Sequence, residues 1–546
     1  MFARIKKSGK YQYLQIVENR KEKGKVKQRV IATLGRLDHM QQKGQVDPLI
    51  RSLAKYSERV MLVLSGRSDV SAESKKIGPV LIFERLWKET GVRKAIKRLL
   101  NGRKYGFDVE RALFLTVLHR LMVSGSDRSC SRWKKDYVIP GTENLELHHM
   151  YRAMAFLGEE LKDQTDALPF SPRCTKDLIE EELFFGHRDL FSGLEMAFFD
   201  TTSIYFEGRG GETLGERGFS KDHRPDLNQI VVGVVLNEQG FPICCEMWPG
   251  STTDVKTLIP VCERMRRRFD ISRFCIVADR GMISSDTIKS LESGEIDLAY
   301  ILGARMRRVK EIREEVLSRA GRFRVVCPEP LTSKDPSPLK VKEVYIGEKR
   351  YIVCLNSQQA KKDTIDREKI IESLRKQLSK GPKTVVGNKG YRKYLRIEKG
   401  SLSLDEEKIK YESRFDGKWV LRTNTDLSSE QVALKYKQLW QVEQIFRDMK
   451  SAFDTRPIFH HRDDTIRGHV FCSFPALVLR KELDRRLENK GFEFEWYDIK
   501  QDLKDLQEVV IEENGKRLAI RTLCKGICGK VFKAAGVSVP AAIREI

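Results

Sequence analysis

The chain has 546 residues, more than the roughly 250 to 300 that one hydrophobic core usually serves, so we expect several domains. It carries 101 Lys and Arg against 77 Asp and Glu, and this formal net charge of +24 favours a polyanionic partner, with nucleic acid as the first candidate. We find no apolar run of about 18 to 20 residues and no signal-peptide core near Met1. This pattern argues against a membrane protein and predicts a soluble protein of the cytoplasm.

The eleven cysteines lack the regular spacing of a disulfide framework, so we expect reduced thiols. Cys524 and Cys528 have a spacing that metal ligands can have, but no second Cys or His pair lies near them in the sequence. The His doublets at 148–149 and 460–461 are also weak metal signals, because neighbouring residues on a helix or strand point in different directions. We predict no metal site from any of these groups.

The first two segments of the chain differ in the spacing of their apolar residues. Residues 1–36 alternate short apolar runs with Lys-rich turns, which predicts a small basic β-hairpin unit able to lie on phosphates. From about 78 to 190 the apolar residues recur at helical spacing, which predicts a helical domain. We expect this domain to contact DNA, although a solvated helical face is the simpler explanation for any single Lys or Arg in it.

From about residue 194 the sequence becomes typical of β structure. The predicted elements are strands over 196–208, 228–237 and 241–248, a helix over 252–269, a strand over 273–282, a further helix, and a strand over 298–304. The short connections between the first three strands predict an antiparallel meander. Meander, helix, strand, helix, strand is the order of an RNase H-like core, with a mixed five-stranded sheet and helices.

Two carboxylates stand out in this core. Asp200 lies inside an apolar strand, where an unpaired charge costs several kcal/mol, and Asp279 ends another strand. The predicted topology makes these strands neighbours, so we expect the two side chains to face each other. Two close carboxylates raise each other's pKa unless a cation lies between them, and Mg²⁺ prefers such oxygen ligands. The alternative is that both acids only cap strand ends.

The segment ALKYKQLWQVEQIFRDMKSAF (433–453) contains no Gly or Pro and predicts one helix of about 30 Å. At 100° per residue, one face of this helix combines Tyr436, Trp440, Glu443, Arg447 and Lys450. A separate apolar stripe, suited to packing on the sheet, consists of Leu439, Val442, Phe446, Met449 and Phe453. We interpret the first face as an active-site face with a carboxylate, aromatic stacking groups and phosphate-binding cations. A surface ladder of ion pairs is the alternative.

Several stretches together resemble the bacterial insertion-sequence transposases of the DDE type, in the group with a β-rich insertion and a Tyr, Arg, Glu, Lys signature helix. These stretches are FFDTTSIYFEG, GFSKDHRPDLNQIVVGVV, PGSTTDVKTL, VADRGM and YKQLWQVEQIFRDMK. The resemblance covers most of the chain. It implies that Asp200, Asp279 and Glu443 are the catalytic residues and bind the metal.

The signature matches at Tyr436 and Lys450, which the resemblance makes phosphate-holding residues, but the family's Arg is Leu439 here. We expect Arg447, one turn beyond the catalytic Glu, to supply the missing cation. Lys221 and Arg224, in the GFSKDHRPD loop, are further candidate DNA contacts. An ion pair within the turn is the alternative explanation for these last two residues.

The long interval between the second and third acids contains strand-like runs, and we interpret 305–427 as an inserted β domain. In relatives such an insertion helps to form a DNA hairpin at the transposon end and holds a flipped base against an aromatic side chain. Trp419 is the only Trp in this interval and is our candidate for that contact. Packing in a strand is the alternative role for it.

The resemblance further implies two Mg²⁺ or Mn²⁺ ions, cleavage at the ends of an insertion sequence, a DNA hairpin, and strand transfer into target DNA. The implied partners are double-stranded DNA, as terminal inverted repeats and target, and a second copy of the chain in a homodimer. The implied place is the nucleoid of a bacterial cytoplasm. A metal-dependent nuclease or resolvase that does not join strands, and a domesticated DNA-binding protein without catalysis, stay open as alternatives.

The expected domains follow from these observations. They are a basic β-hairpin unit with a linker (1–75), a helical DNA-binding domain (76–190), the first part of the catalytic core (191–304), a β-rich insertion (305–427), the second part of the core with the Glu443 helix (428–485), and a C-terminal helical region (486–546). We expect the last of these to be one possible dimerisation surface.

Overall fold

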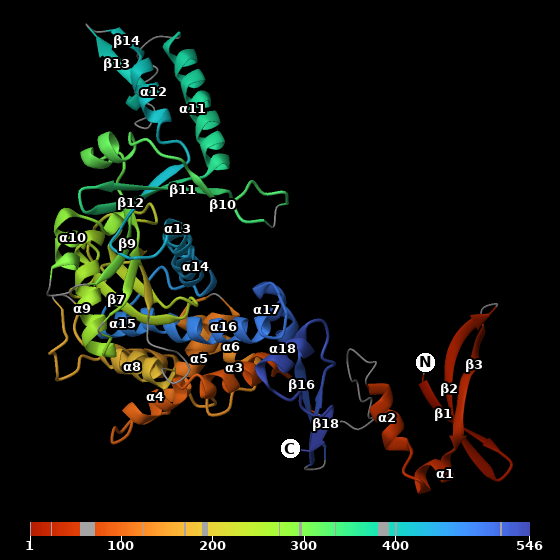
Figure 1. Cartoon of the computed structure of the whole chain (residues 1–546). Coiled ribbons are helices and arrows are strands. Elements are labelled where there is room, and N and C mark those ends of the chain that lie inside the picture. Colours follow the sequence, from red (N-terminus) through yellow and green to blue (C-terminus); the bar gives the residue numbers. More distant parts are fainter. Residues whose placement is uncertain are drawn as a thin grey trace. The chain divides into compact units, whose positions relative to one another are not determined.

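Figure 1 shows the computed structural model of the protein. It describes residues 2–22, 25–54, 71–123, 125–168, 171–187, 195–271, 273–293, 298–332, 335–379, 392–398, 401–513 and 516–545. One compact unit comprises Met1–Leu86, Ser129–Glu143 and Leu483–Ile546, and the other comprises Trp87–Arg128 and Asn144–Glu482. The boundary expected between 190 and 191 lies outside the described residues. Within those ranges, no helix combines the length and the apolar character needed to cross a bilayer.

The first unit begins with a three-stranded antiparallel sheet, in agreement with the predicted basic β unit. Its elements are β1 (Phe2–Ser8), β2 (Tyr11–Glu22) and β3 (Lys25–Arg36), followed by helices α1 (Leu37–Gln42) and α2 (Val46–Ala54). Ser8 pairs with Tyr11, which leaves a two-residue turn. Gly9 occupies this turn at φ +60°, a value that such tight hairpins require and that glycine adopts without strain.

The C-terminal region corrects one expectation, because it is not only helical. Between α17 (Trp496–Asp505) and α18 (Cys528–Ala535) lie two strands, β16 (Gln507–Glu513) and β17 (Lys516–Arg521). They belong to a four-stranded antiparallel sheet in the order β18-β17-β16-β4, with β18 at Ile543–Glu545 and β4 at Ser71–Lys76. The outer partner β4 comes from the opposite end of the chain, so no local pattern pointed to this sheet.

The segment after β4 is helical, as its apolar spacing predicted, but its residues are divided between the two units. Its helices are α3 (Gly78–Glu89), α4 (Val92–Leu99), α5 (Val109–Met122), α6 (Asp127–Trp133), α7 (Leu147–Gly158) and α8 (Thr175–His187). In the second unit, α7 packs closely on α15 (Asp463–Phe471). A Cβ on Gly468 would lie 1.9 Å from the Met154 carbonyl oxygen, so only glycine permits this approach of the two backbones.

The second unit is built on a nine-stranded mixed sheet in the order β10-β11-β12-β15-β9-β8-β5-β6-β7. The strands are β5 (Met196–Tyr205), β6 (Gln229–Leu236), β7 (Pro242–Pro249), β8 (Cys275–Ala278), β9 (Ala299–Ala304), β10 (Arg324–Cys327), β11 (Leu339–Ile346), β12 (Lys349–Leu355) and β15 (Lys418–Thr423). Strands β5, β8 and β9 are mutually parallel, whereas β5, β6 and β7 form the predicted antiparallel meander. Helix α9 (Leu258–Phe269) precedes β8, and α10 (Ser285–Glu292) follows it.

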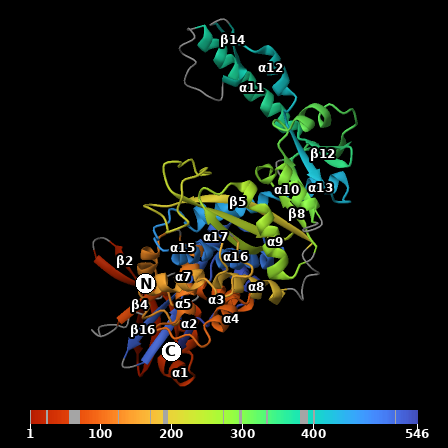
Figure 2. The same ribbon diagram turned by 90° about the vertical axis from the view of Figure 1, so that its left-hand side faces the viewer.

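Helices α9 and α10 cover one face of this sheet, as Figure 2 shows beside β5 and β8. Ala197 and Phe199 of β5 lie in the hydrophobic cluster beneath these helices. Because side chains alternate along a strand, Asp200 between Phe199 and Thr201 belongs to the opposite face. Helix α14 (Trp440–Arg447), from a much later part of the chain, contacts β5 and β6 there.

The interval 305–427 differs from the expected inserted domain. Its strands β10, β11, β12 and β15 continue the core sheet from the edge of β9, because β15 pairs directly with β9. Only α11 (Ser357–Leu378), β13 (Leu395–Glu398), β14 (Ser401–Leu404) and α12 (Glu406–Ser413) form a separate group, seen together in Figure 1. They share a small apolar cluster around Leu374 and Tyr394.

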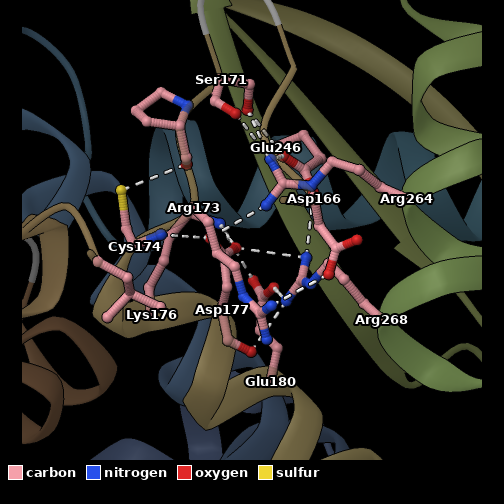
Figure 3. Close-up of polar contacts among 12 residues, drawn as sticks. Asp166, Ser171, Arg173, Cys174, Lys176, Asp177, Glu180, Glu246, Arg264 and Arg268 are labelled. Carbon is pink, nitrogen blue, oxygen red and sulfur yellow. Dashed lines mark hydrogen bonds and ion pairs between the residues drawn. The ribbon is translucent and has the colours of Figure 1, made fainter. Parts of the chain in front are cut away.

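A buried network of charges joins α8, β7 and α9 (Figure 3). Its members, all buried, are Lys176, Asp177, Glu180, Glu246, Arg264 and Arg268. Arg268 donates to Glu180 at 2.6 Å and to Glu246 at 3.1 Å. Three cations thus face three acids away from water, and each charge depends on its partners. The network fixes two helices to the edge strand of the sheet that carries Asp200.

Candidate active site

Asp200 and Asp279 meet on neighbouring parallel strands. Phe199 of β5 pairs with Ala278 of β8, so the next residue on each strand is one of the two acids, as the predicted topology required. Burial raises the pKa of Asp200 to about 6, and the nearby Asp279 and Asp254 carboxylates act in the same direction. The Lys221 ammonium opposes them. The two acids therefore follow paired residues of adjacent strands, and the Asp279 carboxylate helps to raise the pKa of Asp200.

Asp254 is an acid of this cluster that the sequence analysis did not single out. It lies in a 3₁₀ turn (Asp254–Lys256) after β7 and accepts a hydrogen bond from the Thr201 hydroxyl at 2.6 Å. Lys221 lies 3.2 Å from its other carboxylate oxygen and donates to the Thr201 carbonyl at 2.7 Å. Asp254 follows PGSTT in one of the stretches that carried the resemblance, which was the available signal.

Tyr436 holds Asp279. The Tyr436 hydroxyl donates to Oδ1 of Asp279 at 2.7 Å, and burial first, then Asp279, raise the pKa of this tyrosine well above its usual value. A Cβ on Gly303 of β9 would lie 2.4 Å from the same hydroxyl oxygen, so this position must lack a side chain. We expected Tyr436 to hold a phosphate, but its hydroxyl is directed to the second acid instead.

The predicted single helix over 433–453 is divided. Helix α13 (Ser429–Lys437) ends before α14 begins at Trp440, and a π-helical turn occupies Asp448–Ala452. The amide of Leu439 bonds the carbonyl of Tyr436, three residues back, so a tighter turn joins the two helices. Tight and wide turns change the rotation per residue. The face calculated at 100° per residue therefore does not stay on one line.

The side chains of this segment separate into two sets. The predicted apolar stripe is buried and consists of Leu439, Val442, Phe446, Met449 and Phe453. On the predicted polar face, Trp440, Glu443 and Arg447 are exposed, whereas Lys450 is partly buried. Leu439, which stands in place of the signature Arg, is thus a core residue.

Glu443 does not form a ligand-distance group with the two other predicted acids in the described structure. Its helix α14 contacts β5, the strand of Asp200. Over the described ranges, the only three His, Cys, Asp or Glu side chains with ligand atoms all within 4.8 Å are Asp127, His460 and His469. The three predicted acids are therefore not all at ligand distance from one another: Asp200 and Asp279 follow paired residues of neighbouring strands, and Glu443 is exposed on α14.

The expected phosphate-binding residues differ in their surroundings. Lys450 pairs with Asp222 at 2.8 Å, and burial lowers the pKa of Lys450. Arg447 extends into solvent and donates to Gln444 at 3.0 Å. Arg456, which the sequence analysis missed, also pairs with Asp222.

The side chains of three other candidate DNA-contacting residues are bonded to neighbouring residues or partly buried. Arg224 forms an ion pair with Asp226 at 3.0 Å, which is the turn ion pair that we kept as the alternative. Lys221 is bonded to Thr201 and Asp254, as described above. Trp419 is partly buried in β15, paired with Cys354, and its indole N–H is buried without an acceptor in the described part of the chain. These positions favour structural roles for the three side chains.

The Asp127, His460 and His469 group is a hydrogen-bonded network. Arg120 donates to Nδ1 of His469 at 2.9 Å and to the His469 carbonyl at 2.7 Å. Burial lowers the pKa of His469 to about 4, so the ring is neutral at pH 7. The guanidinium occupies the nitrogen that a metal would need, which makes this group a poor cation site. His460 of the 460–461 doublet does belong to this group, a neighbourhood that the sequence analysis did not predict.

The acid pair, in contrast, suits a divalent cation. Asp200 and Asp279 offer carboxylate oxygens, which Mg²⁺ and Mn²⁺ prefer, and their close approach is electrostatically unfavourable without a cation. Glu443, the third predicted ligand, has an exposed side chain on α14. The donor set therefore fits a hard metal ion.

Comparison with known proteins places these observations in context. The transposase DDE domain family matches residues 193–479, and the N-terminal domain of IS1634 family transposases matches residues 3–69. Among solved structures, the chain is similar to piggyBac transposase in a synaptic complex with hairpin DNA, with 12% identity and a TM-score of 0.37, over 78% of this chain and 79% of that chain. A similarity this low supports no argument about mechanism. No curated protein matches the chain.

Proposed function

Because the chain belongs to the DDE transposase family, we propose that it cuts DNA at the ends of an insertion sequence and joins the freed ends to target DNA. The observation that carries this proposal is the side-by-side position of Asp200 and Asp279 on parallel strands within the family match. The strand order β7-β6-β5-β8-β9, with α9 and α10 as the connecting helices, supports an RNase H-like core.

In this proposal Asp200, Asp279 and Glu443 hold two divalent ions, Mg²⁺ or Mn²⁺. Such ions, when bound, stabilise charge on the scissile phosphate and make an oxygen nucleophile more reactive. Tyr436 acts through its hydrogen bond, which keeps the Asp279 carboxylate turned toward Asp200. The exposed Glu443 has the freedom to close on the acid pair when DNA and metal arrive.

The remaining residues of the site position DNA. Lys450 and Arg447 lie beyond Glu443 on the same segment and carry the charge to bind phosphates on either side of the scissile bond. Trp440, with 59% of its surface exposed, offers a flat aromatic face on the same side. The family expectation of a hairpin intermediate requires the freed 3′-hydroxyl to attack the opposite strand before target joining. A homodimer would pair the two ends.

A cleavage assay tests this function. The purified chain is incubated with Mg²⁺ and DNA that carries the inverted repeats flanking its reading frame, and the products are separated on denaturing gels. We expect nicked, hairpin and joined products, and a loss of at least about 1,000-fold in rate for Asp200→Asn and Glu443→Gln with DNA binding retained. Nicking without joining would support the nuclease alternative. DNA binding without any cleavage would support the non-catalytic alternative.

A further inference from the structure

The loop GFSKDHRPD (218–226) is a rigid turn on the strand of the first acid. The Lys221 amide donates to the Ser203 hydroxyl of β5 at 2.8 Å, and the Arg224 amide donates to the Ser220 hydroxyl at 3.0 Å. His223 has φ +58°, a left-handed conformation that a non-glycine residue adopts only when its surroundings hold it there. Two adjacent side chains, Lys221 and Asp222, therefore have defined directions.

These two side chains serve different parts of the site. Lys221 is bonded to Thr201 and Asp254, beside Asp200. The Asp222 carboxylate receives Lys450 at 2.8 Å and also pairs with Arg456. The Asp222 side chain is only 6% exposed, and its Oδ2 is buried without a hydrogen bond in the described structure. Burying a carboxylate oxygen without a hydrogen bond costs free energy. We therefore infer that Asp222 has a function at this position beside the two cations.

Arg456 is held in place by backbone pairing at the end of β5. The Ile458 amide donates to the Tyr205 carbonyl at 3.0 Å, and the Glu207 amide donates to the Ile458 carbonyl at 2.9 Å. The Arg456 guanidinium carbon also lies 6.0 Å from the centre of the Tyr205 ring. Arg456 is 28% exposed, whereas Lys450 is 11% exposed. Two cations thus share the Asp222 carboxylate, and Arg456, the more exposed of the two, also interacts electrostatically with Asp454.

We propose that Lys221 and Asp222 are positioning residues that fix the cation pair Lys450 and Arg456 relative to the acid cluster, and that Arg456 is a further phosphate-binding residue. The loop connects the acid cluster with the cation pair, because Lys221 contacts the first and Asp222 contacts the second from adjacent positions of one turn. An anionic phosphate could bind the solvent-exposed part of the Arg456 guanidinium through charge-assisted hydrogen bonds. This inference rests on the proposed function, since the phosphate is that of the DNA end.

The test compares Asp222→Asn with Asp226→Asn, a control that removes an exposed ion pair in the same loop. We expect Asp222→Asn to lower the cleavage rate about 10- to 100-fold, because the cations move away from the scissile phosphate. The affinity of the DNA-free protein for Mn²⁺, measured by calorimetry, should stay within about twofold of the parent. In a protein that already carries Lys450→Met and Arg456→Met, adding Asp222→Asn should lower the cleavage rate by less than about twofold. Cleavage by Asp222→Asn at the rate of Asp226→Asn would overturn the proposal.

If Asp222→Asn is much less stable than the parent, its lower cleavage rate would not test the proposal. A second variant, Arg456→Met, then provides the test. Arg456→Met removes a partly exposed side chain, and we expect about tenfold weaker binding of the DNA end with a salt slope smaller by about one. Parent-like binding and slope would overturn the assignment of Arg456. The binding measurement does not depend on cleavage, so it tests Arg456 separately from the proposed function. The proposed function would instead be contradicted if Asp200→Asn cleaved DNA at the rate of the parent.

Discussion

Asp200 is an ionisable residue in an otherwise apolar strand, and its position in the fold accounts for its presence there. It lies on the face opposite the Phe199 cluster, next to Asp279, where burial and two other acids hold its pKa at about 6. The folded protein thus binds this proton more tightly than the unfolded chain does. Without metal, the free energy of unfolding should therefore fall as pH rises from about 4 to about 6, and ionised Asp200 should destabilise the fold above that range.

Asp200→Asn should for this reason stabilise the metal-free protein at pH 7.5 by up to about 3 kcal/mol, because Asn cannot ionise, and the gain should disappear below about pH 4. Urea unfolding in EDTA at the two pH values measures the difference. Asp226→Asn is the control, since Asp226 is exposed and its pKa is lowered by Arg224. An equal effect of Asp200→Asn at both pH values would contradict this account.

Gly303 and Tyr436 give a second test at the residue scale. Gly303→Ala places a Cβ against the Tyr436 hydroxyl and should move it away from Asp279, with an expected fall in cleavage of about tenfold. Tyr436→Phe removes both the hydroxyl and much of the clash. The double variant should therefore cleave no more slowly than Tyr436→Phe alone, as measured by initial rates at saturating Mg²⁺. A further additive loss would show that Gly303 acts through another contact.

At the scale of elements, the segment after β15 shows where periodicity succeeds and where it fails. The apolar stripe over 439–453 is buried, because hydrophobic burial depends mainly on residue type and approximate rotation. The polar face is split, because a tight turn at Leu439 and a π-helical turn at 448–452 change the rotation per residue. Tyr436 consequently reaches Asp279, while Glu443 stays exposed.

The buried ion network predicts how firmly α8 and α9 are attached to β7. Arg268→Met removes a cation that contacts Asp177, Glu180 and Glu246, and Lys176 and Arg264 remain as their other partners. We expect it to lower the free energy of unfolding by about 3 to 5 kcal/mol. Arg267→Met, at an exposed position of the same helix, should change it by less than about 0.5 kcal/mol. Urea denaturation monitored by circular dichroism compares the two. Equal stabilities would mean that the network is not a determinant of this packing.

At the scale of the whole molecule, the net charge of +24 governs association with DNA. Each phosphate neutralised by Lys or Arg releases counterions, so we expect the DNA affinity to fall about 1,000-fold or more between about 50 and 200 mM salt. Fluorescence anisotropy with a labelled DNA end measures the slope. A nearly flat dependence would argue that few phosphates are contacted and that the charge serves another purpose.

The nine-stranded sheet is the largest difference between expectation and structure at this scale. Strand patterns around 339–355 and 418–423 were visible in the sequence and are present. Their assignment to a separate domain was wrong in part, because β15 pairs with β9 and joins them to the core sheet. Alternation of side chains identifies a strand, but it does not tell which strand lies next to it.

The sequence by itself determined the strand and helix order of the core and the buried stripe on the later helix, because these follow from local periodicity and short connections. Asp200 and Asp279 were expected to be neighbours only because this order is that of an RNase H-like core. Only the tertiary structure decided that Tyr436 bonds Asp279, that Asp254 and Lys221 join the acid cluster, and that Asp222 holds Lys450 and Arg456. Those contacts join residues far apart in the chain, and their energies depend on distance and burial, which no local pattern encodes.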